Sequence, residues 1–134
     1  MKDAAELSRG LLRKARSDRI AMEASLAAQA YDAACFHAQQ ITEKCLKAFL
    51  AYSRVGFPYT HNLSKLLEIC AGIDAAFRSH LPTVAPLTPY AVELRYDDTF
   101  WPTPKVAGEA RASALAVFQF VLDRLPSDVR KAAE

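Results

Sequence analysis

The sequence predicts an all-α fold, an up-and-down bundle of three long helices with two or three short helices between the second and the last. Apolar residues recur at three- and four-residue steps through long stretches, which is the helical period. Glycine and proline gather in the short breaks between these stretches, where they interrupt a helix. Because the breaks are only a few residues long, we expect neighbouring long helices to lie antiparallel.

Length and composition favour one domain. A chain of 134 residues is long enough for a genuine core, and we expect a helical domain over residues 1–126 and a polar tail over residues 127–134. A net charge of +2 is too small to indicate nucleic-acid binding by itself. No apolar run approaches the roughly 20 residues of a membrane span and no signal peptide is visible, so we expect a cytoplasmic protein. The cysteines, which are Cys35, Cys45 and Cys70, read as reduced core residues.

The first predicted helix runs from Lys2 to about Ala28. Its expected buried stripe consists of Leu7, Leu11, Ala15, Met22 and Leu26, with the charged Asp18 filling one register position. The second helix runs from Tyr31 to Ser53 with a regular seam. That seam consists of Ala34, Ala38, Ile41, Cys45, Ala48 and Tyr52.

One line of the second helix is polar. Gln39, Glu43 and Lys47 follow each other at four-residue steps, so they share one line of the helix surface. We expect a solvated face with one Glu–Lys pair. The alternative is that Gln39, Gln40, Lys44 and Lys47 contact a phosphate or an acidic partner.

Gly56 and Pro58 interrupt the chain, after which Thr60 or Asn62 caps a short helix that ends at Gly72. A further short helix is expected from Asp74 to His80.

Three prolines predict an irregular segment from Leu81 to Pro89. The pair Thr88-Pro89 then predicts a short helix to Tyr96, followed by a loop over residues 97–102. Thr103-Pro104 opens the last long helix, which Pro126 ends. Its expected seam consists of Ala110, Ala114, Val117, Val121 and Leu125.

His61 is the strongest candidate for chemistry. In the first turn of a helix, the positive end of the helix dipole disfavours imidazolium, so we expect a neutral ring that is available as a base. The alternative is a cap or an interhelical hydrogen bond that holds the preceding loop. Arg54 is expected to complement the C-terminal end of the second helix, or alternatively to assist His61 at a phosphate.

The remaining candidates each have a structural alternative. Phe100 and Trp101 either stack a base, or cover the end of the bundle or pack in a dimer interface. Arg95-Tyr96 either binds a ligand or anchors the chain, with Asp97 or Asp98 as an ion-pair partner of Arg95. The other histidines, His37 and His80, have no spaced partners and read as structural, and we expect neither a metal site nor a cofactor.

Three motifs in order resemble the HEPN family, the higher-eukaryote and prokaryote nucleotide-binding domain. They are Ala38-Gln39-Gln40-x2-Glu43-Lys44-x-Leu46-Lys47-Ala48, Thr60-His61-Asn62-Leu63 and Tyr90-x4-Arg95-Tyr96. The family usually continues the third motif with proline, where this chain has Asp97. The resemblance covers nearly the whole chain and implies the same helical bundle.

The resemblance also bears on activity. Some HEPN domains are metal-independent ribonucleases with an arginine and, after four to six residues, a histidine in the C-terminal part of the bundle. Arg54 and His61 fit that count but lie too early, and after Arg95 the required positions hold Phe100, Trp101 and Pro102. The chain is thus more similar to the branch that accompanies small nucleotidyltransferases.

The resemblance therefore implies a non-catalytic interaction module, a homodimer that pairs with a small nucleotidyltransferase in a toxin–antitoxin type of system. One alternative is a metal-independent endoribonuclease in which His61 acts on RNA and Arg54 or Arg95 stabilises the phosphate. Another is a module that binds a nucleotide or small molecule in a cleft beside Lys44, Lys47 and Arg95.

Overall fold

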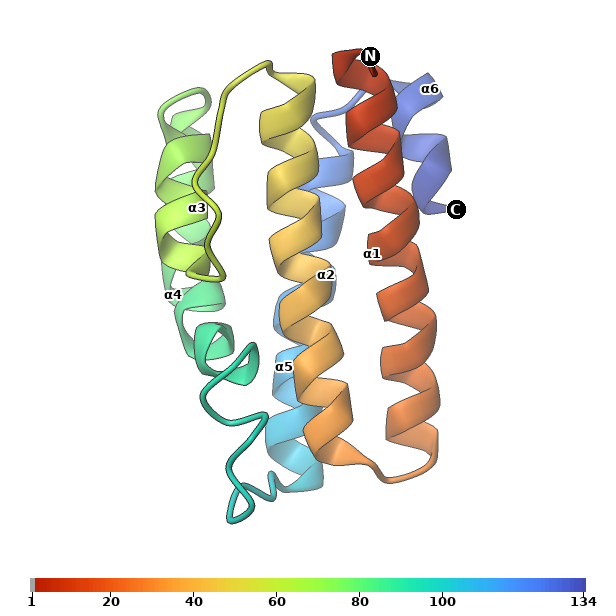
Figure 1. Cartoon of the computed structure of the whole chain (residues 1–134), viewed down its shortest axis with the longest axis vertical. Helices are drawn as coiled ribbons and strands as arrows, with labels where there is room; N and C mark the ends of the chain where they lie inside the picture. Colours follow the sequence, from red (N-terminus) through yellow and green to blue (C-terminus); the bar gives the residue numbers. More distant parts are fainter. Residues whose placement is uncertain (1) are drawn as a thin grey trace.

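The central feature of the fold is one long helix covered by two others. The computed structural model describes residues 2–134. In it α2 (Tyr31–Tyr52) packs against α1 (Ala4–Ala27) and against α5 (Pro104–Leu122) (Figure 1). The shorter elements are α3 (Leu63–Ala71), α4 (Leu81–Val84) and α6 (Ser127–Arg130), with 3₁₀ turns at Ala75–His80, Ala85–Tyr90 and Lys131–Ala133. The predicted all-α bundle is confirmed, and the described residues contain no strand.

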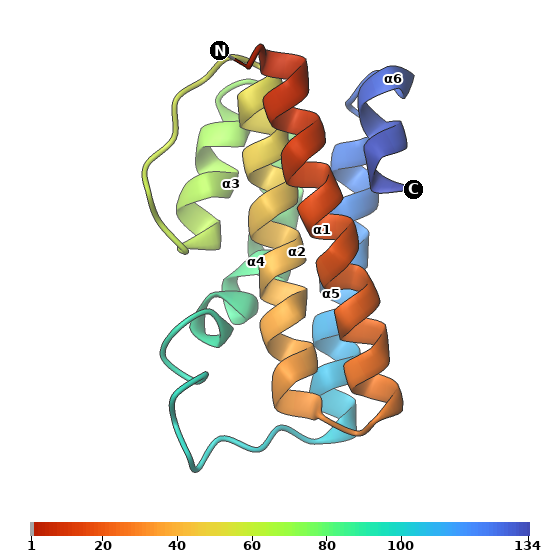
Figure 2. The ribbon, with the colours of Figure 1, turned by 45° about the vertical axis from the view of Figure 1, so that its right-hand side comes forward.

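The first two long helices form an antiparallel pair, as their short connection predicts. Asp3 caps α1 by accepting a hydrogen bond from the Glu6 amide at 2.8 Å. Three residues join α1 to α2, and Gln29 among them takes a positive φ of 62°, which lets the chain reverse direction. The two helices lie side by side in the views of both Figure 1 and Figure 2.

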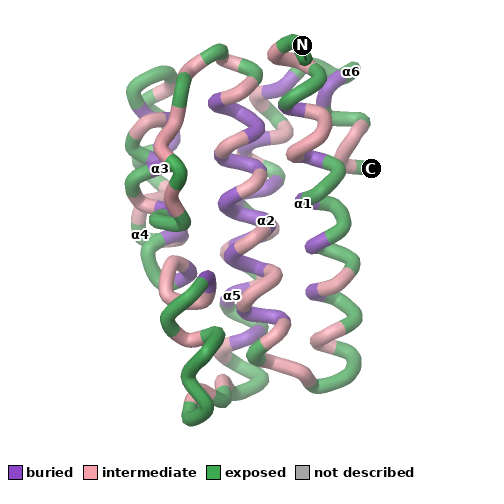
Figure 3. Tube along the Cα trace, in the orientation of Figure 1, coloured by how far each residue is buried: buried purple, intermediate pink, exposed green. Residues whose placement is uncertain are grey.

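The core runs along α2. Figure 3 shows buried residues over the whole length of this helix, because α1, α3 and α5 pack around it. The predicted seam is buried except for Tyr52 in the last turn. The predicted seam of α5 is buried throughout, from Ala110 to Leu125. Apolar spacing predicted the inward face of these two helices correctly, because their buried faces consist mostly of apolar residues.

The predicted stripe of α1 is wrong in part. Leu7 is 47% exposed and Leu11 is only half-buried, whereas Leu12 is fully buried. The buried face consists of Ser8, Leu12, Ala15, Asp18 and Met22. Ser8 can lie inside because its hydroxyl donates to the Ala48 carbonyl of α2 at 2.8 Å. A hydrophobic pattern assigns such polar positions to solvent, so it misplaces the stripe.

The segment between α3 and α5 also differs from expectation. Residues predicted to be irregular form α4 and the following 3₁₀ turn, with Pro82 in the first turn, where no amide donor is needed. Pro89 lies inside the 3₁₀ turn and opens no helix, and residues 91–96 form turns. Thr88 does not cap its own segment. Its hydroxyl accepts a hydrogen bond from the Leu63 amide at 3.1 Å and so helps to hold the start of α3.

Three predicted caps are confirmed, since the side chains of Asn62, Asp74 and Thr103 each accept a hydrogen bond from a backbone amide in the first turn of the element that follows. The residues after Pro126 differ from the polar tail that we expected. They form α6 and a 3₁₀ turn that pack on α1, and Val129 is fully buried. Among the described residues, none of the helices combines the length and the apolar character needed to span a membrane.

Two leucines of α1 test which face is buried. We expect Leu12→Ala to lower the free energy of unfolding by about 2–5 kcal/mol, because the side chain is fully buried and leaves a cavity. Leu7→Ala is the matched control and should cost less than about 1 kcal/mol, since nearly half of that residue is already in water. Urea denaturation measures both, and equal losses would contradict the observed register.

The three cysteines give a chemical test of the core. Burial raises the pKa of the Cys35 thiol to about 11 and that of Cys70 to about 12, and it also raises the pKa of Cys45. Because the thiolate is the reactive form, all three should resist Ellman's reagent at pH 8 in the native protein. All three should react once urea unfolds the chain. A thiol that reacts rapidly before unfolding would contradict this burial.

Candidate functional site

The polar line of α2 is buried, not solvated, and this corrects the sequence-based expectation. Gln39 has no exposed surface and Glu43 has 5%. The Gln39 amide donates to Glu43 Oε1 at 3.0 Å, and Lys47 Nζ donates to Glu43 Oε2 at 3.1 Å. The Gln40 amide donates to Gln39 Oε1 at 2.7 Å and continues the chain toward the surface. The ion pair between Glu43 and Lys47 was predicted correctly. Its burial could not be predicted from the sequence of α2, because it depends on the elements that pack against this helix.

His61 completes this cluster from a different part of the chain. Its Nδ1 atom lies 2.7 Å from Glu43 Oε1, so the imidazole ties the segment after α2 back onto α2 (Figure 1). Asn62 is the N-cap of α3, and Thr60 accepts a hydrogen bond from the Asn62 amide at 3.1 Å. His61 therefore precedes the helix, and its direct electrostatic partner is a carboxylate. This geometry matches the structural alternative for His61, an interhelical hydrogen bond.

The charge of Glu43 is stabilised by its neighbours. Burial raises the pKa of this carboxyl group, but hydrogen bonds from His61 and Gln39 together with the Lys47 ammonium outweigh burial, and the net pKa lies below its ordinary value. Lys47 also lies over the rings of Phe57 and Tyr59, at 5.8 and 5.7 Å from their centres. Lys47 thus contacts a carboxylate and two aromatic rings of the same chain.

Arg54 lies away from His61. It follows α2 with a positive φ of 60° and lines a shallow surface depression with residues at the start of α1. His61 contacts Glu43, about two and a half turns before the end of α2, which corresponds to roughly 13 Å along the axis. Neither hollow lined by Arg54 includes His61. The two residues therefore do not meet in one cleft of this chain.

A second polar bridge joins α1 to α2. Asp18 of α1 accepts from His37 Nδ1 at 2.8 Å, and its other oxygen accepts from Lys44. Asp18 is buried, and the bond fixes the proton of a neutral His37 ring on Nδ1. The sequence indicated a lone structural His37, because its partner lies 19 residues away on another helix. The sequence alone did not indicate this pair.

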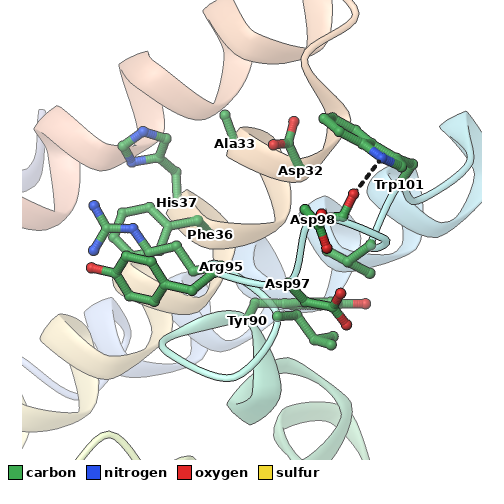
Figure 4. Close-up of a pocket in the computed structure, with 12 residues that line it drawn as sticks. Asp32, Ala33, Phe36, His37, Tyr90, Arg95, Asp97, Asp98 and Trp101 are labelled. Carbon is green, nitrogen blue, oxygen red and sulfur yellow. Dashed lines mark hydrogen bonds between the residues drawn. The ribbon is translucent and has the colours of Figure 1, made fainter.

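A hollow lies beside the first half of α2. It has a volume of about 630 Å³ and is closed on the other side by the segment over residues 90–101 (Figure 4). His37 and Arg95 lie at one end of it. The Arg95 guanidinium carbon lies 4.3 Å from the centre of the Phe36 ring, which in turn lies 5.2 Å from the His37 ring. An arginine on an aromatic face keeps its donors free for a ligand.

Carboxylates and aromatic rings line the rest of the hollow. Asp32, Asp97 and Asp98 contribute the carboxylates. Tyr90 and Phe100 stack with their centres 5.6 Å apart, and Trp101 donates its indole hydrogen to the Asp98 carbonyl at 3.0 Å. Trp101 is 73% exposed, so it is a fixed but open aromatic surface and does not close the end of the bundle.

Asp97, which stands where proline is usual, has a local role. Its carboxylate accepts hydrogen bonds from the Thr99 hydroxyl at 2.6 Å and from the Thr99 amide at 2.9 Å. These bonds from Thr99 hold the pKa of Asp97 below its ordinary value. Asp97 thereby shapes the turn that carries Asp98 and Trp101. Arg95 forms no ion pair with either Asp within the described residues.

The sequence-predicted site residues thus fall into separate places. Gln39, Gln40, Lys47 and His61 belong to the Glu43 cluster, Lys44 to the Asp18 bridge, and Arg95 and Tyr96 to the hollow. The predicted cleft shared by Lys44, Lys47 and Arg95 is not seen, because both lysines are bound to carboxylates. Within residues 2–134 no cluster of His, Cys, Asp and Glu could hold a metal ion.

The Glu43 cluster predicts a pH-dependent stability. We expect Glu43→Gln to lower the free energy of unfolding at pH 7 by about 1–3 kcal/mol, because it leaves buried donors with a weaker acceptor. The folded pKa of Glu43 is lowered, so its contribution is full above about pH 4.5 and is lost as the pH falls through the folded pKa. The difference between wild type and variant should therefore shrink at acidic pH.

Glu109→Gln is the matched control, since Glu109 faces Lys105 four residues away on an exposed helix surface. It should change stability by less than about 0.5 kcal/mol at any pH. Thermal unfolding from pH 3 to pH 8 measures both variants. A Glu43 variant as stable as wild type at pH 7 would contradict the role of this cluster.

Comparison with known proteins agrees with the geometry. The HEPN domain family model matches residues 8–125, which is most of the chain and includes the α2 cluster, His61 and the hollow beside Arg95. No curated protein and no solved structure matches the chain significantly. The helical bundle, the order of its elements and the match over these residues show that the chain belongs to the HEPN domain family.

Proposed function

We propose that this chain is a non-catalytic HEPN interaction module. In this proposal it acts in the cytoplasm as a homodimer and pairs with a small nucleotidyltransferase in a two-component system of toxin–antitoxin type. The observation that carries the proposal is the separation of Arg54 from His61, since neither hollow lined by Arg54 includes His61. For Arg54 and His61 to cut RNA without a metal, the imidazole would have to reach the 2′-hydroxyl while the guanidinium stabilised the adjacent phosphate, so both would have to lie in one cleft.

The surroundings of Arg95 support the same conclusion. The spacing that a ribonuclease needs after Arg95 reaches Phe100, Trp101 and Pro102, none of which can move a proton. Three carboxylates line the same hollow and oppose the approach of a polyanionic RNA backbone. Two exposed aromatic side chains, Tyr96 and Trp101, border the hollow and suit contact with a partner protein.

One observation favours a second candidate function, a metal-independent endoribonuclease built on different residues. His37 is oriented by Asp18 and lies with Arg95 at one end of the hollow (Figure 4). A histidine whose Nδ1 proton is held by a carboxylate leaves Nε2 free to take a proton. In this alternative His37, not His61, would act on the RNA 2′-hydroxyl and Arg95 would stabilise the phosphate.

RNA cleavage in EDTA separates the two functions. We expect no cleavage by wild-type protein above the level of His37→Ala and Arg95→Ala, because the carboxylates of the hollow repel the RNA backbone. Cleavage by wild type that is abolished in either variant, with both variants folded by circular dichroism, would establish the ribonuclease. Arg54→Ala is the control, since Arg54 lies outside the hollow.

Coexpression with a small nucleotidyltransferase from the same genome tests the partner directly. We expect the two chains to copurify and to elute together in gel filtration at a mass larger than either alone. The HEPN chain without its partner should elute as a dimer. Failure to copurify with any candidate nucleotidyltransferase would contradict the proposed pairing, whatever the outcome of the cleavage assay.

A further inference from the structure

Two surfaces of opposite charge lie at the two ends of one face of the bundle. The first is the hollow beside the start of α2, where Asp32, Asp97 and Asp98 outnumber the single Arg95. The second, which we call the α1 groove, is a hollow of about 590 Å³ on the outer side of α1. The α1 groove is lined by Lys2, Leu7, Gly10, Leu11, Arg13, Lys14 and Ser17, and no carboxylate is among these residues.

Both surfaces open on the same side of α2. The α1 groove adjoins a shallow depression that shares Lys2 and Leu7 with it and also includes Ala51 of α2. His37 lines the hollow at the other end, and it precedes Ala51 by 14 residues, which is close to four full helical turns. The two positions therefore face the same way and lie roughly 21 Å apart along the axis. Figure 1 shows the start of α1 at one end of the bundle and residues 90–101 at the other.

The charged groups of both surfaces are free to bind a partner. The cations of the α1 groove form no ion pair within residues 2–134. Asp32 and Asp98 likewise make no ion pair and no side-chain hydrogen bond in this part of the chain, whereas Asp97 is bound by Thr99. Arg95 lies at the far end of the hollow from Asp32 and Asp98 (Figure 4), so it leaves them open to a cation.

The shapes of the two surfaces also fit each other. Trp101 and Tyr96 border the hollow and are 73% and 77% exposed. The Trp101 indole donates to the Asp98 carbonyl at 3.0 Å, so it is a fixed aromatic anchor of the kind that interfaces favour. In the α1 groove, a Cβ atom at Gly10 would meet only the end of the Arg13 side chain, at 4.0 Å. An aromatic ring can therefore lie directly on the α1 backbone at this point.

We propose that a second copy of this chain covers the hollow with its α1 groove in a symmetric dimer. Arg13 and Lys14 of one copy pair with Asp32 and Asp98 of the other, and Trp101 lies over Gly10. A two-fold axis midway between the two surfaces exchanges them, so the dimer makes this contact twice. The inference rests on the homodimer of the proposed function and names the face through which it forms.

Charge favours a second copy over other occupants of this face. An anionic partner such as RNA is attracted to the α1 groove but repelled by the carboxylates of the hollow. A basic protein is attracted to the hollow but repelled by the α1 groove. A second copy presents a cationic surface to the hollow and an acidic surface to the α1 groove, so it matches both at once.

Two charge-reversed variants and their mixture test this interface by sedimentation velocity over a series of concentrations. One variant combines Asp32→Lys with Asp98→Lys, and the other combines Arg13→Glu with Lys14→Glu. Each variant alone brings like charges together in both contacts, so its dimer affinity should fall at least about tenfold below that of wild type. An equimolar mixture brings opposite charges together in both contacts. We expect the mixture to form a heterodimer with nearly the affinity of the wild-type dimer.

Lys105→Glu combined with Lys131→Glu is the matched control, because both lysines are exposed and lie outside the two surfaces. This control should dimerise like wild type, and circular dichroism checks that every variant is folded. Restoration in the mixture cannot come from misfolded chains, so the result does not depend on the losses alone. Dimers that persist in both reversed variants, or a mixture that stays monomeric, would overturn the interface.

The outcome is distinguishable from failure of the proposed function. Dimers that persist in both variants would overturn this face and leave the homodimer in place, whereas a monomeric wild type would overturn the homodimer as well. Restored dimers in the mixture without any nucleotidyltransferase complex would overturn the pairing and leave this interface. If a nucleotidyltransferase complex is lost in either variant while the dimer persists, the face belongs to the nucleotidyltransferase and the inference is overturned.

Discussion

The structure depends on the burial of α2 from three sides. Helices α1, α3 and α5 pack around it, so its polar residues cannot all reach water. A buried carboxylate without donors would be costly, and Glu43 is tolerated because Gln39, Lys47 and His61 surround it. This requirement draws His61, and with it the segment after α2, onto the central helix. This contact adds to the burial of Leu63, Leu66 and Leu67, which packs α3 into the core.

A second buried carboxylate, between α1 and α2, is also satisfied by hydrogen-bond donors from another element. Asp18 is buried and takes donors from His37 and Lys44. The two carboxylates thus use one histidine and one lysine each, but with different consequences. His61 is held at the Glu43 cluster, away from the hollow, whereas His37 is held at the edge of the hollow beside Arg95. Both histidines are thus oriented by a carboxylate of another element, and of the two His37 is the one that lies beside Arg95.

The hollow itself is a product of the irregular segment that precedes α5. Prolines prevent this segment from forming a long helix, so it packs on α2 through the side chains of Tyr90, Arg95 and Phe100. Charges of opposite sign are then kept apart at its two ends.

The sequence by itself determined the helical class, the three long helices and the seams of α2 and α5, because these depend on local propensity and on the helical period. It also indicated the caps at Asp74 and Thr103, and it left Thr60 or Asn62 open as the cap of α3, where the structure has Asn62. Only the tertiary structure decided that Gln39 and Glu43 are buried, that Asp18 orients His37, and that Arg54 and His61 lie apart. Each of these depends on contacts between residues distant in the chain, where a polar side chain can lie inside once another element supplies its hydrogen-bond partner.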